Sequence, residues 1–449
     1  MPKIPPGPAG NFYSQLQDLR SDFLAYLLNS AREHGDLVRL NPGPGTYLYL
    51  VNHPDLVREI LVTKANHYHK SAMTQKMVGR FLGRGLIINE GKSHRQQRKL
   101  AQPAFHKKRV DAYAHAMVDL TQKEMATWRP KEGIKTETFD FEASMIRLTM
   151  KIVAKTLFGV DVGEESTQIG RIMELFAEAI GGQFKALPLP QWLPIPRHLR
   201  QKAAVAEMNT LIEQMVAAWR KDGVDNGDLM SMLLLARDEE TGQGMSDKQL
   251  RDELVSIYFA GHETVAKLIS WIVYQLTQYP AVAERVHAEI KANLGQEPIG
   301  PQDLAQLPYL DQVVKETLRL YPSAWVYDRT PLQDVELGGF HVPAGATIYV
   351  SPYVSQRDGR FFDRPDEFLP ERFEPGWEQA LPRYAYYPFG GGPRICIGQA
   401  FAEMEAKLIL ATILSEFSFE LATTDPIIPE PGATLRPKDG LPVRATLIS

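Results

Sequence analysis

Cysteine is the scarcest residue of this chain, because Cys396 is the only one among 449 residues. A single thiol excludes an intramolecular disulfide, and such a chain fits a reducing compartment. The sequence also lacks a run of about 18 apolar residues, which a membrane-spanning helix needs, and it shows neither a signal peptide nor an anchor. We therefore predict a soluble, cytoplasmic protein with no integral membrane insertion.

A large excess of charge of one sign is missing as well. The 50 basic and 54 acidic residues leave a formal net charge of −4, so the chain has no overall bias toward nucleic acid. Internal repeats and long low-complexity linkers are also missing, whereas 44% apolar residues are enough for a large core. We expect a single domain over residues 1–449, with a Pro-rich N-terminal segment at 1–10, in place of the three or so domains that length alone would give.

What the sequence does contain is mainly helical periodicity. Between residues 105 and 320 the pattern is helical, whereas short apolar runs at 47–51 and 346–350 are typical of strands. The longest helix is predicted to begin at Ser246, which opens a capping-box pattern, and to end at Tyr279, because a proline follows. Such a helix is about 48 Å long. We expect it to be central to the fold.

The segment around the lone cysteine is rich in glycine and precedes a helical pattern. A free cysteine is often a small buried hydrophobe, and this alternative stays open for Cys396. A helix N-terminus favours a thiolate, however, and a thiolate binds metals. Gly392 and Gly398 allow a flat ligand to approach the backbone, while Phe389 can shield the sulfur and Arg394 can meet a ligand anion.

This segment resembles the haem-binding loop of the cytochrome P-450 superfamily, the haem-thiolate monooxygenases, because those five residues stand at the family's spacing. The resemblance implies a bacterial-type soluble member with a mainly α fold, a smaller β region and a long central helix over a buried haem. It also implies haem b (iron protoporphyrin IX) as the cofactor, with Cys396 as the ligand of the iron.

In the middle of the long helix the chain reads Ala260-Gly261-His262-Glu263-Thr264. Glycine weakens a helix interior by about 1 kcal/mol, and a threonine hydroxyl can bond a carbonyl one turn back, so the pair can open a kink. A helix flaw tolerated by packing is the alternative. The stretch resembles the superfamily's oxygen-binding motif. That resemblance implies that Thr264 donates a hydrogen bond to dioxygen, that Glu263 relays protons with water, and that Ala260 and Gly261 leave room for oxygen.

Glu316 and Arg319 stand at i and i+3 of a predicted helix, where they can pair. An exposed pair of this kind is common and contributes only a few tenths of a kcal/mol. With Arg372, which lies in a later Pro-Glu-Arg-Phe segment, they nevertheless resemble the family's Glu-x-x-Arg helix and its partner loop. The resemblance implies a buried triad that braces the haem-ligand loop and has a structural role.

Haem carries two propionates, which need cationic or donor partners when they are buried. The resemblance implies Arg98, Arg329 and Arg394 as these partners. The family usually has a tryptophan four residues before the first of them, whereas this chain has His94. An imidazole can still donate to a propionate, and a surface histidine is the alternative.

One stretch of the chain is basic although the whole is slightly acidic. A charge run is often only a solvated face, but in the resembled fold this stretch borders the side from which electrons enter. We therefore predict that part of it docks an acidic ferredoxin or flavodoxin, with its reductase, on a protein that is itself a monomer. Because a single cysteine excludes a cysteine-ligated iron–sulfur cluster, electrons are expected from such a separate partner. The stretch contains Lys92, His94, Arg95, Arg98, Lys99, His106, Lys107, Lys108 and Arg109.

Apolar residues near these motifs predict a pocket for an apolar substrate, and ordinary core packing is the alternative. The Pro-rich segment 187–196 cannot form a regular helix, and we expect an apolar lip there that leaves peripheral membrane contact open. The motif variants resemble the branch that includes fatty-acid hydroxylases, which favours a fatty acid or a terpenoid-like molecule. The predicted pocket residues are Phe81, Leu82, Leu86, Phe259, Ala324, Trp325 and Val326.

The resemblance as a whole implies a monooxygenase, an oxidoreductase that inserts one oxygen atom from O2 into its substrate. Two alternatives keep the haem-thiolate, namely a peroxygenase or hydroperoxide isomerase, and a non-enzymatic haem gas sensor. An intact Glu263–Thr264 pair argues against both, because neither needs a proton relay to dioxygen. A third alternative is acyl transfer with Cys396 as nucleophile, but no base or oxyanion site stands near the thiol in the sequence.

Overall fold

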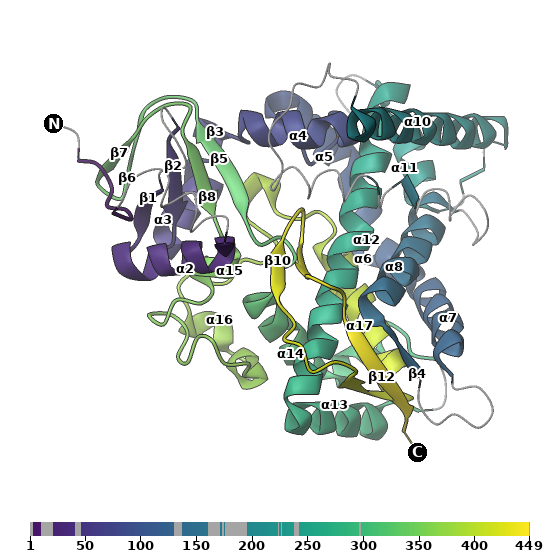
Figure 1. Cartoon of the computed structure of the whole chain (residues 1–449). Coiled ribbons are helices and arrows are strands. Elements are labelled where there is room, and N and C mark those ends of the chain that lie inside the picture. Colours follow the sequence, from purple (N-terminus) through teal and green to yellow (C-terminus); the bar gives the residue numbers. More distant parts are fainter. Residues whose placement is uncertain are drawn as a thin grey trace. The chain divides into compact units, whose positions relative to one another are not determined.

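The computed structural model of this chain forms two compact units (Figure 1). Unit 1 comprises Met1–Lys76 and Lys315–Ile397, and unit 2 comprises Met77–Val314 and Gly398–Ser449. Each unit therefore combines segments that are far apart in the sequence. The single domain expected for the whole chain stays a prediction. The structure describes residues 3–9, 21–40, 46–129, 137–159, 171–172, 175, 195–222, 224–225, 227–237, 242–295 and 298–448.

Most of the elements of unit 1 are short strands and short helical turns. Two helices, α4 and α14, begin in one unit and end in the other. The elements are α2 (Phe23–His34), β1 (Leu37–Leu40), β2 (Leu48–Val51), α3 (Pro54–Arg58), the π-helical turn η1 (Glu59–Thr63), η2 (Ala65–His67), β3 (Tyr68–His69), α4 (Ala72–Leu82), α14 (Pro308–Leu320), β5 (Tyr327–Pro331), β6 (Val335–Leu337), β7 (Phe340–Val342), β8 (Thr347–Val350), α15 (Pro352–Ser355), η6 (Pro370–Phe373), α16 (Trp377–Ala380) and η7 (Gly392–Arg394).

A five-stranded sheet with the order β1-β2-β8-β5-β3 organises unit 1. Strands β2 and β8 run parallel, and the other neighbours run antiparallel. The runs 47–51 and 346–350, both predicted as strands, are therefore neighbours in one sheet. Strands β6 and β7 form a separate hairpin.

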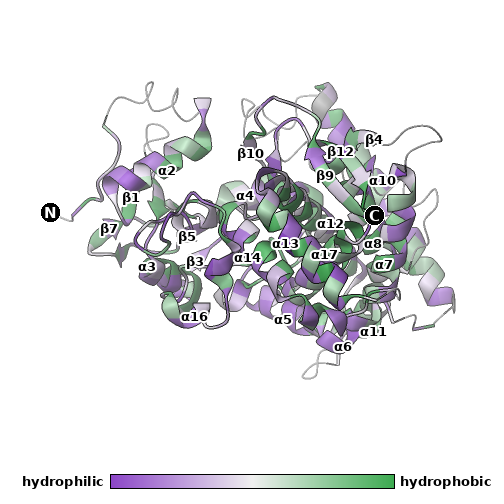
Figure 2. Cartoon of the chain, turned by 90° about the horizontal axis from the view of Figure 1, so that it is seen from below, coloured by the Kyte–Doolittle hydropathy of each residue, from purple (hydrophilic) through white to green (hydrophobic). Residues whose placement is uncertain are grey.

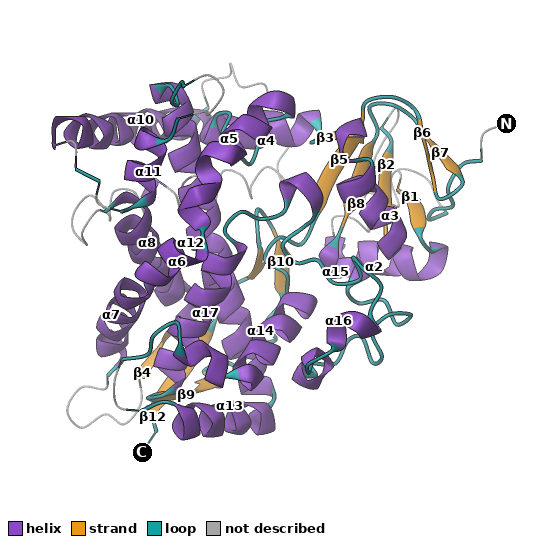
Figure 3. Cartoon of the chain, turned by 180° about the vertical axis from the view of Figure 1, so that it is seen from behind, coloured by secondary structure: helices purple, strands orange, loops and turns teal. Residues whose placement is uncertain are grey.

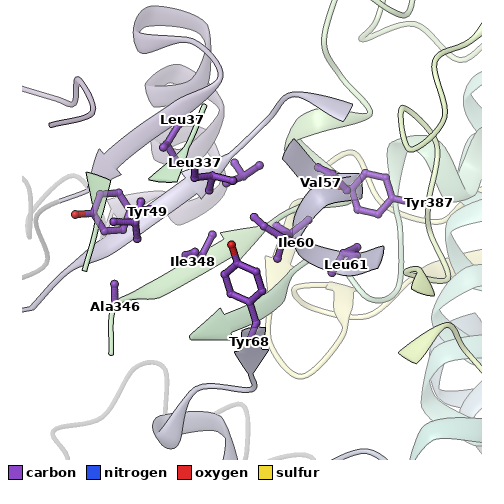
Figure 4. Close-up of a cluster of buried hydrophobic side chains, with 13 residues drawn as sticks. Leu37, Tyr49, Val57, Ile60, Leu61, Tyr68, Leu337, Ala346, Ile348 and Tyr387 are labelled. Carbon is purple, nitrogen blue, oxygen red and sulfur yellow. The ribbon is translucent and has the colours of Figure 1, made fainter. Parts of the chain in front are cut away.

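The apolar core of unit 1 lies on this sheet (Figure 4). Ile60 and Leu61 come from η1 and pack in one cluster with Ile348 of β8. Tyr387, only 3% exposed, belongs to the same cluster although it lies shortly before the lone cysteine in the chain. The segment that leads to Cys396 is thus anchored in the sheet core.

Unit 2 is dominated by helices (Figure 3). Its strands form the antiparallel sheet β4-β12-β9 and the hairpin β10–β11. The elements are α5 (Gly91–Ala101), η3 (Gln102–Phe105), α6 (Lys107–Ala112), α7 (Ala114–Met125), η4 (Ala126–Trp128), β4 (Glu137–Asp140), α8 (Phe141–Phe158), α10 (Pro196–Asp222), α11 (Leu229–Leu235), α12 (Asp247–Gln278), α13 (Pro280–Asn293), η5 (Asp303–Gln306), α17 (Gln399–Leu414), β9 (Phe417–Leu421), β10 (Pro429–Pro431), β11 (Leu435–Pro437) and β12 (Pro442–Leu447).

The predicted long helix is α12, which has 32 residues. Its capping box is present, because Ser246 and Gln249 bond each other's amides through their side chains, at 3.3 and 3.0 Å. The helix ends at Gln278, one residue before the predicted end, since Pro280 starts α13. Most of α12 is buried, and the helix packs against α8 and α17. Figure 2 shows these helices coloured by hydropathy. The prediction of a mainly helical fold with a long central helix is confirmed.

Two expectations concern membranes. No helix within the described ranges is long and apolar enough to cross a membrane. The Pro-rich segment, which was expected to form an apolar lip, lies outside the described residues up to residue 194, and α10 begins at Pro196.

Candidate functional site

The loop that carries the lone cysteine is held by its own backbone. The amide of Cys396 donates to the carbonyl of Phe389 at 2.9 Å. Gly390 and Gly392 have φ angles of +76° and +64°, in the left-handed region that favours glycine. A Cβ on Gly392 would lie 2.0 Å from the carbonyl oxygen of Leu61, so glycine is needed for the loop to approach η1. The sequence pointed to a ligand at Gly392, whereas the close neighbour found there is main chain.

The side chain of Cys396 is exposed, so the alternative of a buried hydrophobic cysteine is wrong. Burial, together with the nearby charge of Cys396, raises the pKa of Tyr327 above its ordinary value. The phenol therefore keeps its proton and donates to the carbonyl of Pro388 at 2.8 Å, which fixes the segment before the cysteine. An accessible sulfur on a braced loop has the chemistry that a haem iron needs from a thiolate ligand.

Two predicted propionate partners lie in unit 1. Arg329, on β5, is only 7% exposed and donates to the carbonyl of Asp328 at 2.7 Å, and Arg394 in η7 is partly buried. The carboxylate of Asp328 accepts from the amide of Ser71 and from the hydroxyl of Thr74, at 2.5 and 3.1 Å, which holds the start of β5 in place. Cations in such a setting fit the carboxylates of a buried haem.

The three residues of the predicted triad lie together. Glu316 and Arg319 are fully buried, and the guanidinium of Arg319 donates two bonds to Glu316, at 2.7 and 2.8 Å. Arg372 donates to the same carboxylate at 3.3 Å. Arg319 also donates to the carbonyls of Gln356 and Pro365, at 2.9 and 2.7 Å. The alternative of an exposed surface pair is wrong, because the pair ties α14 to the loop that follows α15.

Gln356 connects this triad to the cysteine loop, and no sequence pattern marked it in advance. Its amide nitrogen donates to the carbonyls of Leu318 and Arg319, at 3.1 and 3.0 Å. Its amide oxygen accepts from the backbone of Tyr387 at 2.9 Å. The carbonyl of Tyr387 in turn accepts from Gly390 at 2.9 Å. A continuous set of hydrogen bonds therefore runs from α14 into the glycine-rich turn.

In unit 2, one short stretch in the middle of α12 is more accessible than the helix on either side of it. Phe259, Ala260, Gly261 and Thr264 are partly exposed, whereas residues 252–258 and 265–273 are buried. These four positions were predicted to face oxygen or substrate. An apolar and accessible stretch within a buried helix is suited to line a ligand site.

The hydroxyl of Thr264 donates to the carbonyl of Ala260 at 2.7 Å, which is the one-turn-back bond expected for threonine. Helix α8 packs close by. A Cβ on Gly261 would lie 3.2 Å from a methyl group of Val153, and the hydroxyl of Thr149 donates to the carbonyl of His262 at 2.9 Å. Gly261 was expected to leave room for oxygen, and the structure shows that it also allows α8 to approach.

Glu263 is turned into unit 2 and is 8% exposed. Its Oε1 accepts a hydrogen bond from the hydroxyl of Thr434 at 2.9 Å. Thr434 lies in the turn of the β10–β11 hairpin, 171 residues away in the sequence. Sequence reasoning missed this threonine, because nothing local marks it.

Helix α5 carries the remaining predicted haem contacts, at i and i+4. His94 is 5% exposed, which makes the surface-histidine alternative wrong, and Arg98 is partly buried. The basic residues around them are exposed, including Lys107 and Lys108 at the start of α6. Lys107 pairs with Asp111 at 2.7 Å.

The predicted pocket residues have different surroundings. The carbonyl of Phe81 accepts from Arg251 at 3.3 Å, and the amide of Leu86 donates to Glu253 at 2.9 Å, so this segment is seated on α12. Leu82 is buried there as well. Trp325 packs edge to face on Phe23, with ring centroids 5.7 Å apart, as ordinary core packing would have it. Ala324 and Val326, on either side of Trp325, are partly exposed.

The site residues predicted from the sequence fall into two sets, one in each unit. Within its own unit, each set is supported by several elements. Unit 1 holds Cys396, Phe389, Gly392, Arg394, Arg329, the triad and residues 324–326, and unit 2 holds His94, Arg98, Phe81, Leu82, Leu86, residues 259–264 and Gly398.

Comparison with known proteins decides what this architecture is. A family model described as Cytochrome P450 matches residues 4–443. The chain belongs to the cytochrome P450 family. Cyclooctatin synthase of Streptomyces melanosporofaciens is 34% identical to this cytochrome P450 over 423 residues, which cover 93% of this chain and 88% of the relative. Pentalenene oxygenase of Streptomyces avermitilis is 33% identical, with coverage of 92% and 88%.

The fold agrees with this assignment. The solved structure of retinoic acid-bound cyanobacterial CYP120A1 has a TM-score of 0.87 to this chain at 27% identity, and each chain is covered completely, at 100%. As a cytochrome P450, the protein is an oxidoreductase that incorporates oxygen and binds haem b. The exposed thiol and the braced loop of unit 1 fit that cofactor.

Proposed function

We propose that this cytochrome P450 hydroxylates or epoxidises a terpenoid, inserting one oxygen atom from O2. The observation that carries the proposal is the accessible stretch of α12, where apolar Phe259 and Ala260 lie one turn before Thr264, and where buried Glu263 directly precedes that threonine. An apolar wall suits a hydrocarbon skeleton, and an adjacent acid–alcohol pair suits proton delivery. The names of relatives that act on pentalenene or form cyclooctatin support a terpenoid over a fatty acid.

We assign the haem contacts as follows. Cys396 holds the iron, and Arg98, Arg329, Arg394 and His94 hold the propionates. Bound haem supplies the redox chemistry that activates dioxygen. The triad on Glu316 stabilises the loop that presents Cys396 and takes no part in the reaction.

Proton handling falls to two neighbouring residues. Glu263 exchanges protons at its carboxylate, and Thr264 passes them toward the oxygen site. In the structure the hydroxyl proton of Thr264 points to the carbonyl of Ala260. To donate elsewhere, the hydroxyl must rotate away from that carbonyl, and Glu263 can replenish the proton that it gives up.

Electrons come from a separate ferredoxin or flavodoxin. The exposed basic residues of α5 and α6 offer a positive surface to such an acidic protein. Lys107 is already paired with Asp111, so Lys108 is the better contact of the two.

The proposal is tested on the haem-loaded protein. Its dithionite-reduced form with carbon monoxide should give the long-wavelength Soret band that is typical of a thiolate ligand. With a ferredoxin and its reductase, pentalenene or retinoic acid should shift the resting Soret band and yield a product carrying one atom of labelled dioxygen. Dodecanoic acid is the matched probe for a fatty acid.

Two outcomes contradict the proposal. If dodecanoic acid is the one probe that shifts the Soret band and yields product, the enzyme acts on fatty acids. Product formation from hydrogen peroxide at the same rate without reductase would make it a peroxygenase.

A further inference from the structure

The β10–β11 hairpin of unit 2 contacts α12 at two buried points. The hydroxyl of Thr434 donates to Oε1 of Glu263 at 2.9 Å, and the indole of Trp271 donates to the carbonyl of Leu435 at 3.0 Å. Thr434 is 5% exposed and Trp271 is fully buried. The two helix positions are eight residues apart, or about 12 Å along the axis. The hairpin is therefore seated along the helix and does not merely touch it at one side chain.

The carboxylate of Glu263 has one oxygen engaged and one open. Its Oε2 is buried and has no hydrogen-bond partner within the described part of the chain. An ionised carboxylate offers about four acceptor sites, so most of the capacity of Glu263 is unused. Thr434 donates the one hydrogen bond that fixes which oxygen is held and which is left open.

The cations nearby are committed to other acids. Lys267, one turn along α12 from Glu263, is buried and bonds Glu142 at 2.5 Å. Arg436, in β11, bonds Glu430 at 2.7 Å. A neutral hydroxyl thus orients Glu263. A salt bridge would instead hold the carboxylate permanently in its charged form.

We propose that Thr434 is a positioning residue for proton delivery. Its hydroxyl holds Oε1 of Glu263 against the hairpin, which leaves Oε2 as the oxygen that takes up a proton and releases it again. The carboxylate is regenerated after each transfer. This inference rests on the proposed monooxygenase function, because it assumes that Glu263 supplies protons there.

The first test compares Thr434→Val, which keeps the branched shape but removes the donor, with Thr434→Ser, which keeps the hydroxyl. The holoenzyme is reduced through ferredoxin with pentalenene as the probe, or with retinoic acid if only that compound shifts the Soret band. We expect Thr434→Val to lower the product formed per NADPH about threefold or more, with a matching rise in peroxide. Thr434→Ser should stay within about twofold of the parent. The midpoint of the probe-induced Soret shift should stay the same in both variants, because positioning a proton donor does not alter probe binding.

The second test asks whether Thr434 acts through Glu263. In a Glu263→Gln background, Thr434→Val should lower the product formed per NADPH by less than about a further twofold, because both changes interrupt one route of proton delivery. An equal proportional loss in both backgrounds would overturn the inference. So would a full loss in Thr434→Ser, since the hydroxyl would then not be the group that matters.

A third measurement is independent of turnover. Urea unfolding of the holoprotein is followed for Thr434→Val, Glu263→Ala and the double variant, and the midpoint shifts should be non-additive if the bond exists in solution. Additive shifts, together with a lowered product per NADPH in Glu263→Gln, would refute the hydrogen bond between Thr434 and Glu263 and leave the proposed function intact. An unimpaired Glu263→Gln would instead refute the proposed proton role of Glu263, and the inference with it.

Discussion

Two buried glutamates show how differently this fold treats the same side chain. Glu316, in unit 1, accepts hydrogen bonds from Arg319, Arg372 and the amide of Leu369. Among the described residues, Glu263, in unit 2, accepts one hydrogen bond, and its second oxygen has no partner there. Fixed cations and an amide fill acceptor sites of the first carboxylate, whereas the second has an oxygen that no described group holds. The number of donors thus separates a structural acid from one that is suited to catalysis.

Two further buried acids of unit 2 resemble Glu263, because each has a carboxylate oxygen without a partner among the described residues. Glu253 accepts from the amide of Leu86 through one oxygen, and its other oxygen has no partner among the described residues. Glu405 is fully buried, and neither of its oxygens has a partner there. Burial raises the pKa of Glu253 to about 7 and that of Glu405 well above its ordinary value. Burial with few donors therefore favours the protonated form of these two acids.

The largest expected effect is at Glu316. Replacement by alanine leaves two arginines facing a site without its anion, and breaking a buried pair costs roughly 3–5 kcal/mol. We expect little soluble protein with haem in Glu316→Ala, as measured by the reduced carbon monoxide spectrum per unit of protein. Glu374→Ala, at an exposed position nearby, is the control and should load haem normally. Normal haem content in Glu316→Ala as well as in the control would contradict the structural role of Glu316.

The next effect concerns Glu253 and pH. Its pKa is about 7 in the folded protein and 4.5 in its ordinary state, so the folded form binds more protons between those values. Unfolding free energy should therefore fall as pH rises from about 4.5 to 7, by roughly 3 kcal/mol from this group. Glu253→Gln keeps an acceptor for Leu86 but cannot ionise, so its stability relative to the parent should increase over that range. Urea unfolding at pH 5 and pH 8 measures the difference, and a constant difference would show that Glu253 does not titrate there.

A smaller effect is expected at the alcohol beside the open acid. Thr264→Ala should bind haem and probe as the parent does, yet lower the product per NADPH about tenfold and release the electrons as peroxide. Thr277→Ala is the matched control, because that hydroxyl also bonds a carbonyl of α12, at 2.7 Å. Unchanged coupling in Thr264→Ala would place the relay elsewhere.

The smallest effect should come from exposed charges, which are screened by salt. Reversal to glutamate at both Lys107 and Lys108 should slow reduction by ferredoxin about threefold at low ionic strength, and the difference should disappear at high salt. Lys123→Glu, on α7, is the control for a change in charge alone. An unchanged rate at low salt would mean that the basic surface does not dock the partner.

Features that depend on neighbouring residues were predictable from the sequence. The start of α12 follows from a capping box and its end from a proline, and the glycine-rich loop marked Cys396. Glu316 and Arg319 are one helical turn apart, which made their pairing predictable, although their burial required the family resemblance.

Contacts between distant segments were not predictable in this way. Gln356 reaches Tyr387, and Thr434 reaches Glu263, through single hydrogen bonds that leave no periodic pattern. Gly392 illustrates a second limit, because a glycine signals close approach but not what approaches. Only the folded sheet brings the carbonyl of Leu61 there.

The parallel pairing of β2 with β8 has a consequence for the synthesis of this protein on the ribosome. β2 is buried along its whole length, yet the strand that covers one of its edges is made about 300 residues later. At roughly 5–20 residues per second, the nascent β1–β2 hairpin waits between about 15 and 60 s for that strand. An apolar strand with an open edge is a template for wrong pairing during this interval. Synthesis that stalls before residue 347 would therefore leave a chain prone to aggregation, and chaperones that shield strand edges would matter most for the first fifty or so residues.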